Sequence, residues 1–191
     1  VSLYGSKATI TGSTLTSDGI APRVAADTVT GSVAQVFSST ITGMSRGATV
    51  SHLSLLEMTD TTLLANAADG IGLEVFNGNA SAVRGTIVGG LNGIQVSDYI
   101  NPENAVINLD STTVTGRTGA AIIVENYDSG ATHTKINVMN GSTLIGGNGN
   151  LLEVNGTSTA TLRVSDSNTQ LKGDVIAASG ATANVILDNQ A

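Results

Sequence analysis

Side chains that could do chemistry are few and scattered in this chain. It has two histidines, His52 and His133, which lie far apart and outside any HExxH or paired-ligand spacing. It has no cysteine, which removes thiolate metal sites and disulfides and leaves the compartment open. We therefore expect no metal site and no cofactor, and we place both histidines on the surface of strands.

A short segment, Tyr127-Asp128-Ser129-Gly130, resembles the Asp-Ser-Gly core of a serine-protease nucleophile loop, and His133 lies nearby. Such a site also needs an oxyanion loop, an orienting acid and a base that come from different parts of a barrel. The surrounding sequence supplies none of these, so we predict that the segment is a turn.

The glycine-rich segment Gly146-Gly147-Asn148-Gly149-Asn150-Leu151 begins like the calcium-binding nonapeptide of RTX repeats. The sixth position of that motif is an Asp ligand, and here it is Leu151. Because a calcium ion needs several oxygen ligands and the motif does not recur in tandem, we predict a corner of the chain and no calcium site.

Acidic side chains are the remaining route to catalysis, since β-helical polysaccharide lyases and hydrolases use closely placed carboxylates. Glu74 and Glu153 occupy the same outward place in matching Leu-Glu-Val segments. Two turns intervene, which puts them about 14 Å apart if strands stack at roughly 4.8 Å. That separation is too large for paired catalysis, and we predict no catalytic residue and no enzyme. The other acids considered are Asp60, Asp110, Glu125 and Asp166.

A recurring Thr-rich phrase indicates the secondary-structure elements that would carry these side chains. It occurs at 13–16, 39–42, 61–64, 85–88, 112–115, 142–145 and 168–171, and its apolar members are separated by 26, 22, 24, 27, 30 and 27 residues. Those members are Leu15, Ile41, Leu63, Ile87, Val114, Leu144 and Leu171. A period of this length is typical of a solenoid.

The solenoid is expected to be built of strands. Segments such as Leu73-Glu74-Val75 and Leu162-Arg163-Val164 alternate apolar and polar residues, and 25 of the 191 residues are threonine. Helical repeats need long runs of helix formers at 3.6 spacing, and no long stretch here is free of Gly, Asn or clustered Thr.

One repeat can be followed from Ala105 to Asn126, with strands at 106–109, 112–115 and 121–124. The next turn has strands at 135–139, 142–145 and 151–154, with corners at Asn140-Gly141 and at Gly146 to Asn150. The fold class is therefore all-β, a parallel β-helix of three strands per turn and about seven turns. An antiparallel sandwich stays open as an alternative, because five Asn-Gly pairs, at Asn77, Asn92, Asn140, Asn148 and Asn155, are also hairpin signals.

The chain is expected to form one domain over 1–191, less regular over 1–104 and clearly repetitive over 105–191. The segment from Asp98 to Asn104, with Tyr99 and Pro102, is predicted to be a loop, either a protrusion for recognition or a plain solvated corner. Because the chain starts without Met and stops after a predicted strand, we expect a fragment or processed piece of a longer protein.

The composition excludes several classes of binding partner. The net charge is −7 and the eight basic residues are scattered, which argues against nucleic acid and anionic lipid. No apolar run is long enough for a transmembrane helix, so direct membrane insertion of this segment is not expected. Thr-x-Thr pairs such as Thr40/Thr42 suggest an ice-binding face, but Leu64, Val88 and Ile145 interrupt the second position, and we read the pairs as ordinary outward threonines.

Several phrases of the C-terminal half resemble the passenger domains of pertactin-like autotransporters, which are exported by type V secretion. The phrases are Asn137 to Leu144, Leu162 to Ser167, Leu171 to Val175 and Asn184 to Asn189. The resemblance covers about residues 105–191, and the remainder shares only the rhythm. It implies a right-handed β-helix on the surface of a Gram-negative bacterium, acting in adhesion, self-association or interference with host factors.

No functional residue transfers through this resemblance. The integrin-type Arg-Gly-Asp of pertactin is replaced here by Arg46-Gly47-Ala48 and Arg84-Gly85-Thr86. The expected function is therefore that of a non-enzymatic, extracellular stalk or adhesin whose binding residues are unknown. Its expected partner is a host surface or matrix protein, or another copy of itself. A β-helical polysaccharide lyase or hydrolase and a passive scaffold for another domain are the alternatives.

Overall fold

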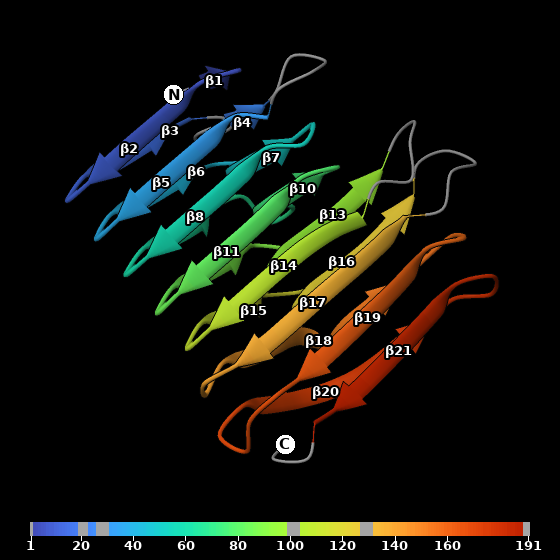
Figure 1. Ribbon diagram of the computed structural model, residues 1–191. Coiled ribbons are helices and arrows are strands. Elements are labelled where there is room, and N and C mark those ends of the chain that lie inside the picture. The colour runs from blue at the N-terminus through green and yellow to red at the C-terminus, as the bar shows by residue number, and fades with distance from the viewer. Residues whose placement is uncertain (1, 19–22, 26–30, 99–103, 127–131, 189–191) are drawn as a thin grey trace.

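The structure is a computed structural model that describes residues 2–18, 23–25, 31–98, 104–126 and 132–188. All strand pairings in these ranges are parallel, and none of the residues described is helical. The strands stack one above another, with β2 and β21 at opposite ends of the pile (Figure 1). The expected parallel β-helix is confirmed, with about six complete turns where seven were expected.

Three flat faces run along the solenoid, and each turn adds one strand to each face. Face 1 is an eight-stranded sheet, the front row of Figure 1. Its strands are β2 (Lys7–Thr11), β5 (Val33–Phe37), β8 (Leu55–Thr59), β11 (Asn79–Val83), β14 (Asn104–Asp110), β17 (His133–Met139), β19 (Thr159–Val164) and β21 (Thr182–Leu187).

Faces 2 and 3 belong to a single thirteen-stranded sheet, because β18 and β20 run through both faces. Face 2 contains β3 (Thr14–Ser17), β6 (Thr40–Gly43), β9 (Thr62–Ala65), β12 (Thr86–Gly89), β15 (Thr113–Gly116) and the first parts of β18 (Thr143–Val154) and β20 (Gln170–Ala177). Face 3 contains β1 (Ser2–Tyr4), β4 (Arg23–Ala25), β7 (Arg46–Ser51), β10 (Ile71–Phe76), β13 (Ile94–Asp98), β16 (Ile122–Asn126) and the last parts of β18 and β20.

The core is a set of apolar ladders that run along the axis. On face 2 the ladder is the one expected from the Thr-rich phrase, since Leu15, Ile41 and the later members are paired in register on successive turns. Ile41, Leu63, Ile87, Val114 and Leu144 are fully buried. Burying each such side chain contributes about 1.5–3 kcal/mol, so stacking of turns is the main source of stability.

Two expectations about local structure need correction. The corner expected at Gly146 to Asn150 is part of the twelve-residue strand β18, which bends there with shifts of register against β20. The bend stays hydrogen-bonded to the turn below, through Asn148 N to Gly119 O and Ala121 N to Asn150 O. The stretch from Leu55 to Val83, which lies in the part of the chain expected to be less regular, also folds regularly, as β8 to β11.

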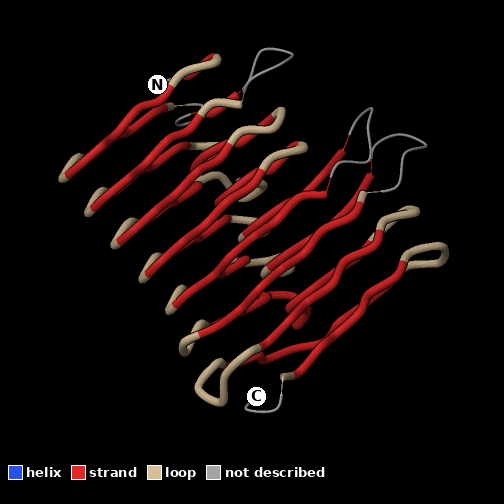
Figure 2. Tube along the Cα trace, viewed as in Figure 1, coloured by secondary structure: helices blue, strands red, loops and turns tan. Residues whose placement is uncertain are grey.

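The sandwich alternative is wrong. Asn77 and Asn140, two of the Asn-Gly positions that suggested hairpins, instead adopt left-handed backbone conformations at corners between parallel strands. Figure 2 shows the short connections that separate the strands at these corners. An Asn-Gly pair marks a tight bend, and the bend here joins two faces of one turn.

Candidate functional site

The corner between face 1 and face 2 has the same backbone bend on six successive turns. One residue of each bend has a positive φ, between 48° and 57°. We call these six residues the corner row: Gly12, Ser38, Asp60, Arg84, Ser111 and Asn140. Left-handed conformations are uncommon for residues other than glycine, and Asn and Asp tolerate them best. Because the bend recurs in register, the side chains of the corner row form a line along the outside of the solenoid.

Beneath the corner row lies a ladder of buried hydroxyls. Thr112 Oγ1 accepts a hydrogen bond from Gly85 N at 3.2 Å and lies within donor distance of Ala82 O and Asp110 O, at 3.0 and 2.8 Å. One turn on, Ser142 Oγ accepts from Thr112 N at 3.0 Å. Ser39 and Thr61 bond the backbone in the same way on earlier turns. The hydroxyls satisfy backbone groups that the bends take out of the sheets, so this ladder has a structural role.

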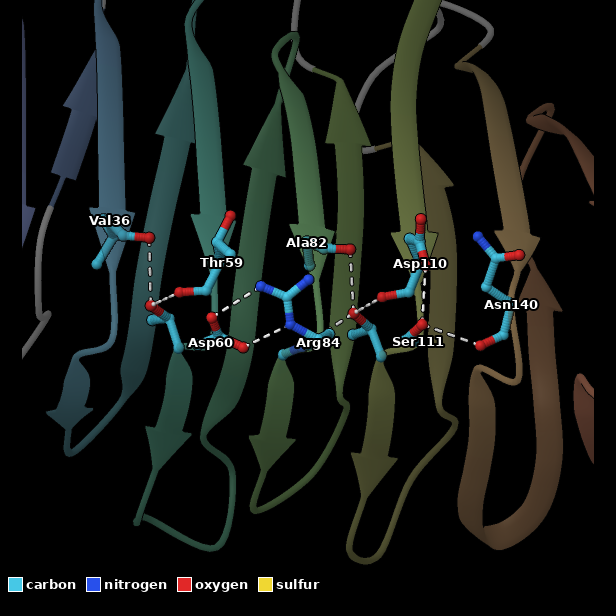
Figure 3. Close-up of polar contacts among 11 residues, drawn as sticks. Val36, Thr59, Asp60, Ala82, Arg84, Asp110, Ser111 and Asn140 are labelled. Carbon is cyan, nitrogen blue, oxygen red and sulfur yellow. Dashed lines mark hydrogen bonds and ion pairs between the residues drawn. The ribbon is translucent and has the colours of Figure 1, made fainter.

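The exposed part of the corner row carries an ion pair between neighbouring turns (Figure 3). Arg84 Nε and Nη2 donate to the two carboxylate oxygens of Asp60 at 2.7 and 2.8 Å, which is a bidentate arrangement. The hydrogen bond from Arg84 lowers the pKa of Asp60, and the same bond raises the pKa of Arg84. On the next turn, Ser111 Oγ lies within donor distance of Asp110 Oδ1 and of the carbonyl oxygen of Asn140, at 2.9 and 3.0 Å.

Next to the corner row, face 2 presents an unbroken line of threonines. Strand pairing aligns Thr14, Thr40, Thr62, Thr86, Thr113 and Thr143, and we call this line the first rank. Two residues further along each strand lies the second rank: Thr16, Thr42, Leu64, Val88, Thr115 and Ile145. Both ranks alternate with the buried ladder and therefore point outward.

The ranks correct one point of the sequence interpretation. The Thr-x-Thr pair is indeed interrupted at Leu64, Val88 and Ile145, as expected. The first rank is nevertheless complete over six turns, which we missed because we examined the pairs and not each position. The signal was present in the sequence, since a threonine directly precedes each of the first six ladder residues from Leu15 to Leu144.

Solvent reaches face 2 but hardly reaches the outer side of face 3. Every residue of the two ranks on face 2 is half-buried or exposed. On face 3 the outward residues Thr49, Glu74, Gln95 and Ile123 are all less than one tenth exposed. Face 2 is therefore an accessible surface for a partner, and face 3 is not, along these turns.

The outward carboxylates of face 3 are occupied by neighbouring side chains. Glu74 accepts from Arg46 Nε at 2.8 Å and from Thr49 Oγ1 at 3.2 Å. Glu153 Oε1 accepts from the side-chain amides of Asn148 and Asn150, at 2.6 and 2.7 Å. Strand register places Gln95 and Ile123 between Glu74 and Glu153, so the two expected intervening turns are confirmed. At roughly 4.8 Å per strand this corresponds to about 14 Å.

The remaining acids considered from the sequence are also spread over several turns. Glu125 accepts from Gln95 Nε2 at 2.7 Å, and Asp166 accepts hydrogen bonds from its own corner. Asp60, Asp110 and Asp166 all lie on the corner between face 1 and face 2, on different turns. Glu125 and Glu153 lie on adjacent strands of face 3, two residues out of register. Each accepts a hydrogen bond from an amide side chain, and Glu74 accepts from Arg46 and Thr49.

The histidines are both exposed and lie in different turns. His133 begins β17, as expected for a strand residue, whereas His52 lies in a corner with a positive φ of 53°. The placement of His52 on a strand is therefore wrong. In the described part of the chain, no three His, Asp or Glu side chains are grouped so that they could hold a metal ion.

Two segments singled out in the sequence lie outside the described residues: Tyr127 to Gly130, and the inner part of the 98–104 loop with Tyr99 and Pro102. Asp98 and Asn104 themselves end β13 and begin β14. Comparisons of the chain with protein-family models, curated proteins and solved structures found no match. Among the described residues there is no helix long and apolar enough to cross a membrane.

Proposed function

We propose that this chain is a non-enzymatic stalk or adhesin of the bacterial cell surface, of the autotransporter-passenger type suggested by its C-terminal phrases. The observation that carries the proposal is the accessible outer side of face 2, which has no charged residue in its two ranks from Thr14 to Ile145, in a chain of net charge −7. A rigid rod with a continuous face offers many weak contacts to a host protein or to another copy of itself. The occupied carboxylates of face 3 favour this function over catalysis.

The proposal is tested on bacteria that display the chain on their surface, by deleting residues 1–191 and measuring cell aggregation and binding to host cells. Loss of either activity is the expected result. If both are unchanged in cells that no longer display residues 1–191, the adhesive role is wrong and the chain is a spacer or scaffold.

The enzyme alternative, a polysaccharide lyase or hydrolase, draws its support from the outward Glu74, Glu125 and Glu153 of face 3. It predicts release of reducing ends from acidic or neutral glycans by the purified chain. Activity that disappears on a single substitution such as Glu74→Gln, with the fold retained, would replace the adhesive function by this one.

A further inference from the structure

We infer that face 2 is a self-docking surface, on which a second copy of the chain packs face to face with its solenoid axis antiparallel. The inference rests on the proposed function, because it gives self-association a surface and a geometry. It is argued in turn from accessibility, apolar content, charge and symmetry.

The two ranks of face 2 are accessible and rich in methyl groups. Every member is Thr, Leu, Val or Ile, and none of the twelve is buried. Away from the last two strands, four large apolar residues of the described part are exposed, and three of them belong to this side. Ile145 (41% exposed) is in the second rank, and Met44 (44%) and Leu91 (37%) lie on the corners that follow β6 and β12. Apolar groups gathered on one side of a soluble chain mark an interaction surface.

Over the six turns of the ranks the same face lacks charge, and Lys172 of β20 comes next in line after Ile145. No residue of either rank is ionisable, although the whole chain has fifteen acidic and eight basic residues. Two copies with net charge −7 repel each other through most approaches, and face 2 is the side on which the repulsion at contact is least. A second copy is thus a better match to this face than a strongly charged partner is.

Symmetry gives the position of the two-fold axis. A two-fold interface joins the same patch on both copies, so that residue i of one copy meets residue j of the other and the reverse. The centre of the first rank falls between Thr62 and Thr86, on the third and fourth of its six turns. An axis that passes there, parallel to the strands, overlaps the six turns that carry threonine in the first rank and leaves Lys172 of β20 outside the contact. It places Leu64 of one copy against Val88 of the other. The apolar pair then lies at the centre and threonines lie on both sides.

The corner row selects this antiparallel arrangement. Asp60 and Arg84 flank the same two central turns, so the axis brings Asp60 of each copy to the side of Arg84 of the other. Ser111 would meet Ser38, and Asn140 would meet Gly12, so no like charges are opposed along the row. In a parallel arrangement the corner row would instead lie against the opposite edge, where Gly43, Ala65, Gly89 and Gly116 end their strands.

The size of the face predicts a weak dimer. Six strands at roughly 4.8 Å and four residues at about 3.3 Å give on the order of 400 Å² per copy, about half of the roughly 800 Å² per partner in a stable complex. A single pair therefore dissociates readily in dilute solution. Many copies on two facing cells would act together, and avidity would then hold the cells.

The first experiment measures the mass of the purified chain by analytical ultracentrifugation at rising concentration. The wild type is expected to shift from monomer toward dimer. Val88→Lys places a charge at the centre of face 2 and should weaken association at least tenfold, while Ser81→Lys, the matched control on face 1 of the same turn, should associate like the wild type. A wild type that stays monomeric, or equal effects of both lysines, would overturn the inference.

The orientation is tested by exchanging the corner charges. Arg84→Asp alone opposes two acids across the axis and should weaken the dimer, whereas the double variant Asp60→Arg with Arg84→Asp restores both the internal ion pair and the contact between copies. Association that does not recover in the double variant contradicts the antiparallel arrangement. Distances between labels attached at positions 14 and 143 offer a second test of the orientation. Thr14 of one copy should lie nearer to Thr143 than to Thr14 of the other copy.

Displaying Val88→Lys on bacteria separates this inference from the proposed function. Loss of aggregation with host-cell binding retained supports both. Aggregation equal to that of the wild type, or loss of host binding by a chain that never dimerises, contradicts the self-docking face and leaves the adhesive function standing. Failure of the deletion of 1–191 to change either activity removes the proposed function, whatever the purified chain does.

Discussion

At the scale of single residues, the role of the buried hydroxyls at the corner between face 1 and face 2 can be tested by substitution. Thr112→Val keeps the shape of the side chain but leaves Gly85 N without its acceptor and removes the hydroxyl donor beside Ala82 O and Asp110 O. An unsatisfied buried backbone group costs about 1–3 kcal/mol, so we expect a clearly lower midpoint of thermal unfolding by circular dichroism. Thr113→Val, one residue on and pointing outward, should change stability by no more than about 0.5 kcal/mol. Equal effects would mean that the hydroxyl ladder does not stabilise the corner.

Asp166 predicts a pH dependence at the same scale. The hydroxyl of Thr169, and then the backbone N–H groups of Asn168 and Gly141, donate to its carboxylate and lower its pKa. A carboxyl whose pKa is lowered by folding adds stability above its unfolded value of about 3.9 and loses that contribution as the pH falls through the folded value. The wild type should therefore be more stable than Asp166→Asn near pH 7, and the difference should shrink below about pH 3.9. Asp60 is present in both proteins, so its own titration cancels, and a difference that is constant with pH contradicts the prediction.

At the scale of elements, the sequence predicts the strands well and their connections less well. Alternating segments became strands within one or two residues, because alternation reports which face is buried. The Gly146 to Asn150 segment was expected to be a corner that separates two strands, since glycine and asparagine are typical of corners. It became a bent strand because its backbone groups find partners in the neighbouring turns, a long-range effect that local composition does not carry.

The bend of β18 depends on the missing side chain of Gly147. A Cβ atom there would lie 1.9 Å from the carbonyl oxygen of Arg117 in the turn below. We expect Gly147→Ala to destabilise the chain by about 3 kcal/mol, the upper end of what overpacking usually costs, since a backbone atom must move. In Gly85→Ala, by contrast, the added atom would be 3.4 Å from the nearest atom, Thr61 O, and the unfolding midpoint should hardly change. A tolerated Gly147→Ala would show that β18 can separate from its neighbour at little cost.

At the scale of the whole molecule, the repeat period predicts the solenoid, but it does not predict which outer face is accessible to solvent. Leu-Glu-Val segments look alike in sequence, and alternation predicts an exposed Glu74. In the structure Glu74 is buried under Arg46 and Thr49, whereas the threonines of face 2 are accessible. Which face is covered depends on contacts between turns about 25 residues apart, so the candidate surface could be recognised only once strand register aligned Thr14 through Thr143.

A solenoid of this kind should open from its ends, and hydrogen exchange can show it. Each turn contacts only its neighbours, so a central turn has two stabilising interfaces and an outermost turn has one. The inward residues of the last strand reflect this, since Leu187 is 62% exposed whereas Ile87 in the fourth turn is fully buried. We expect backbone amides of β9, β12 and β15 to exchange slowest, and those of β3 and β20 on the same face to exchange fastest. Protection that followed faces and not turns would mean that the three faces unfold as separate units, contrary to a stack whose stability is passed from turn to turn.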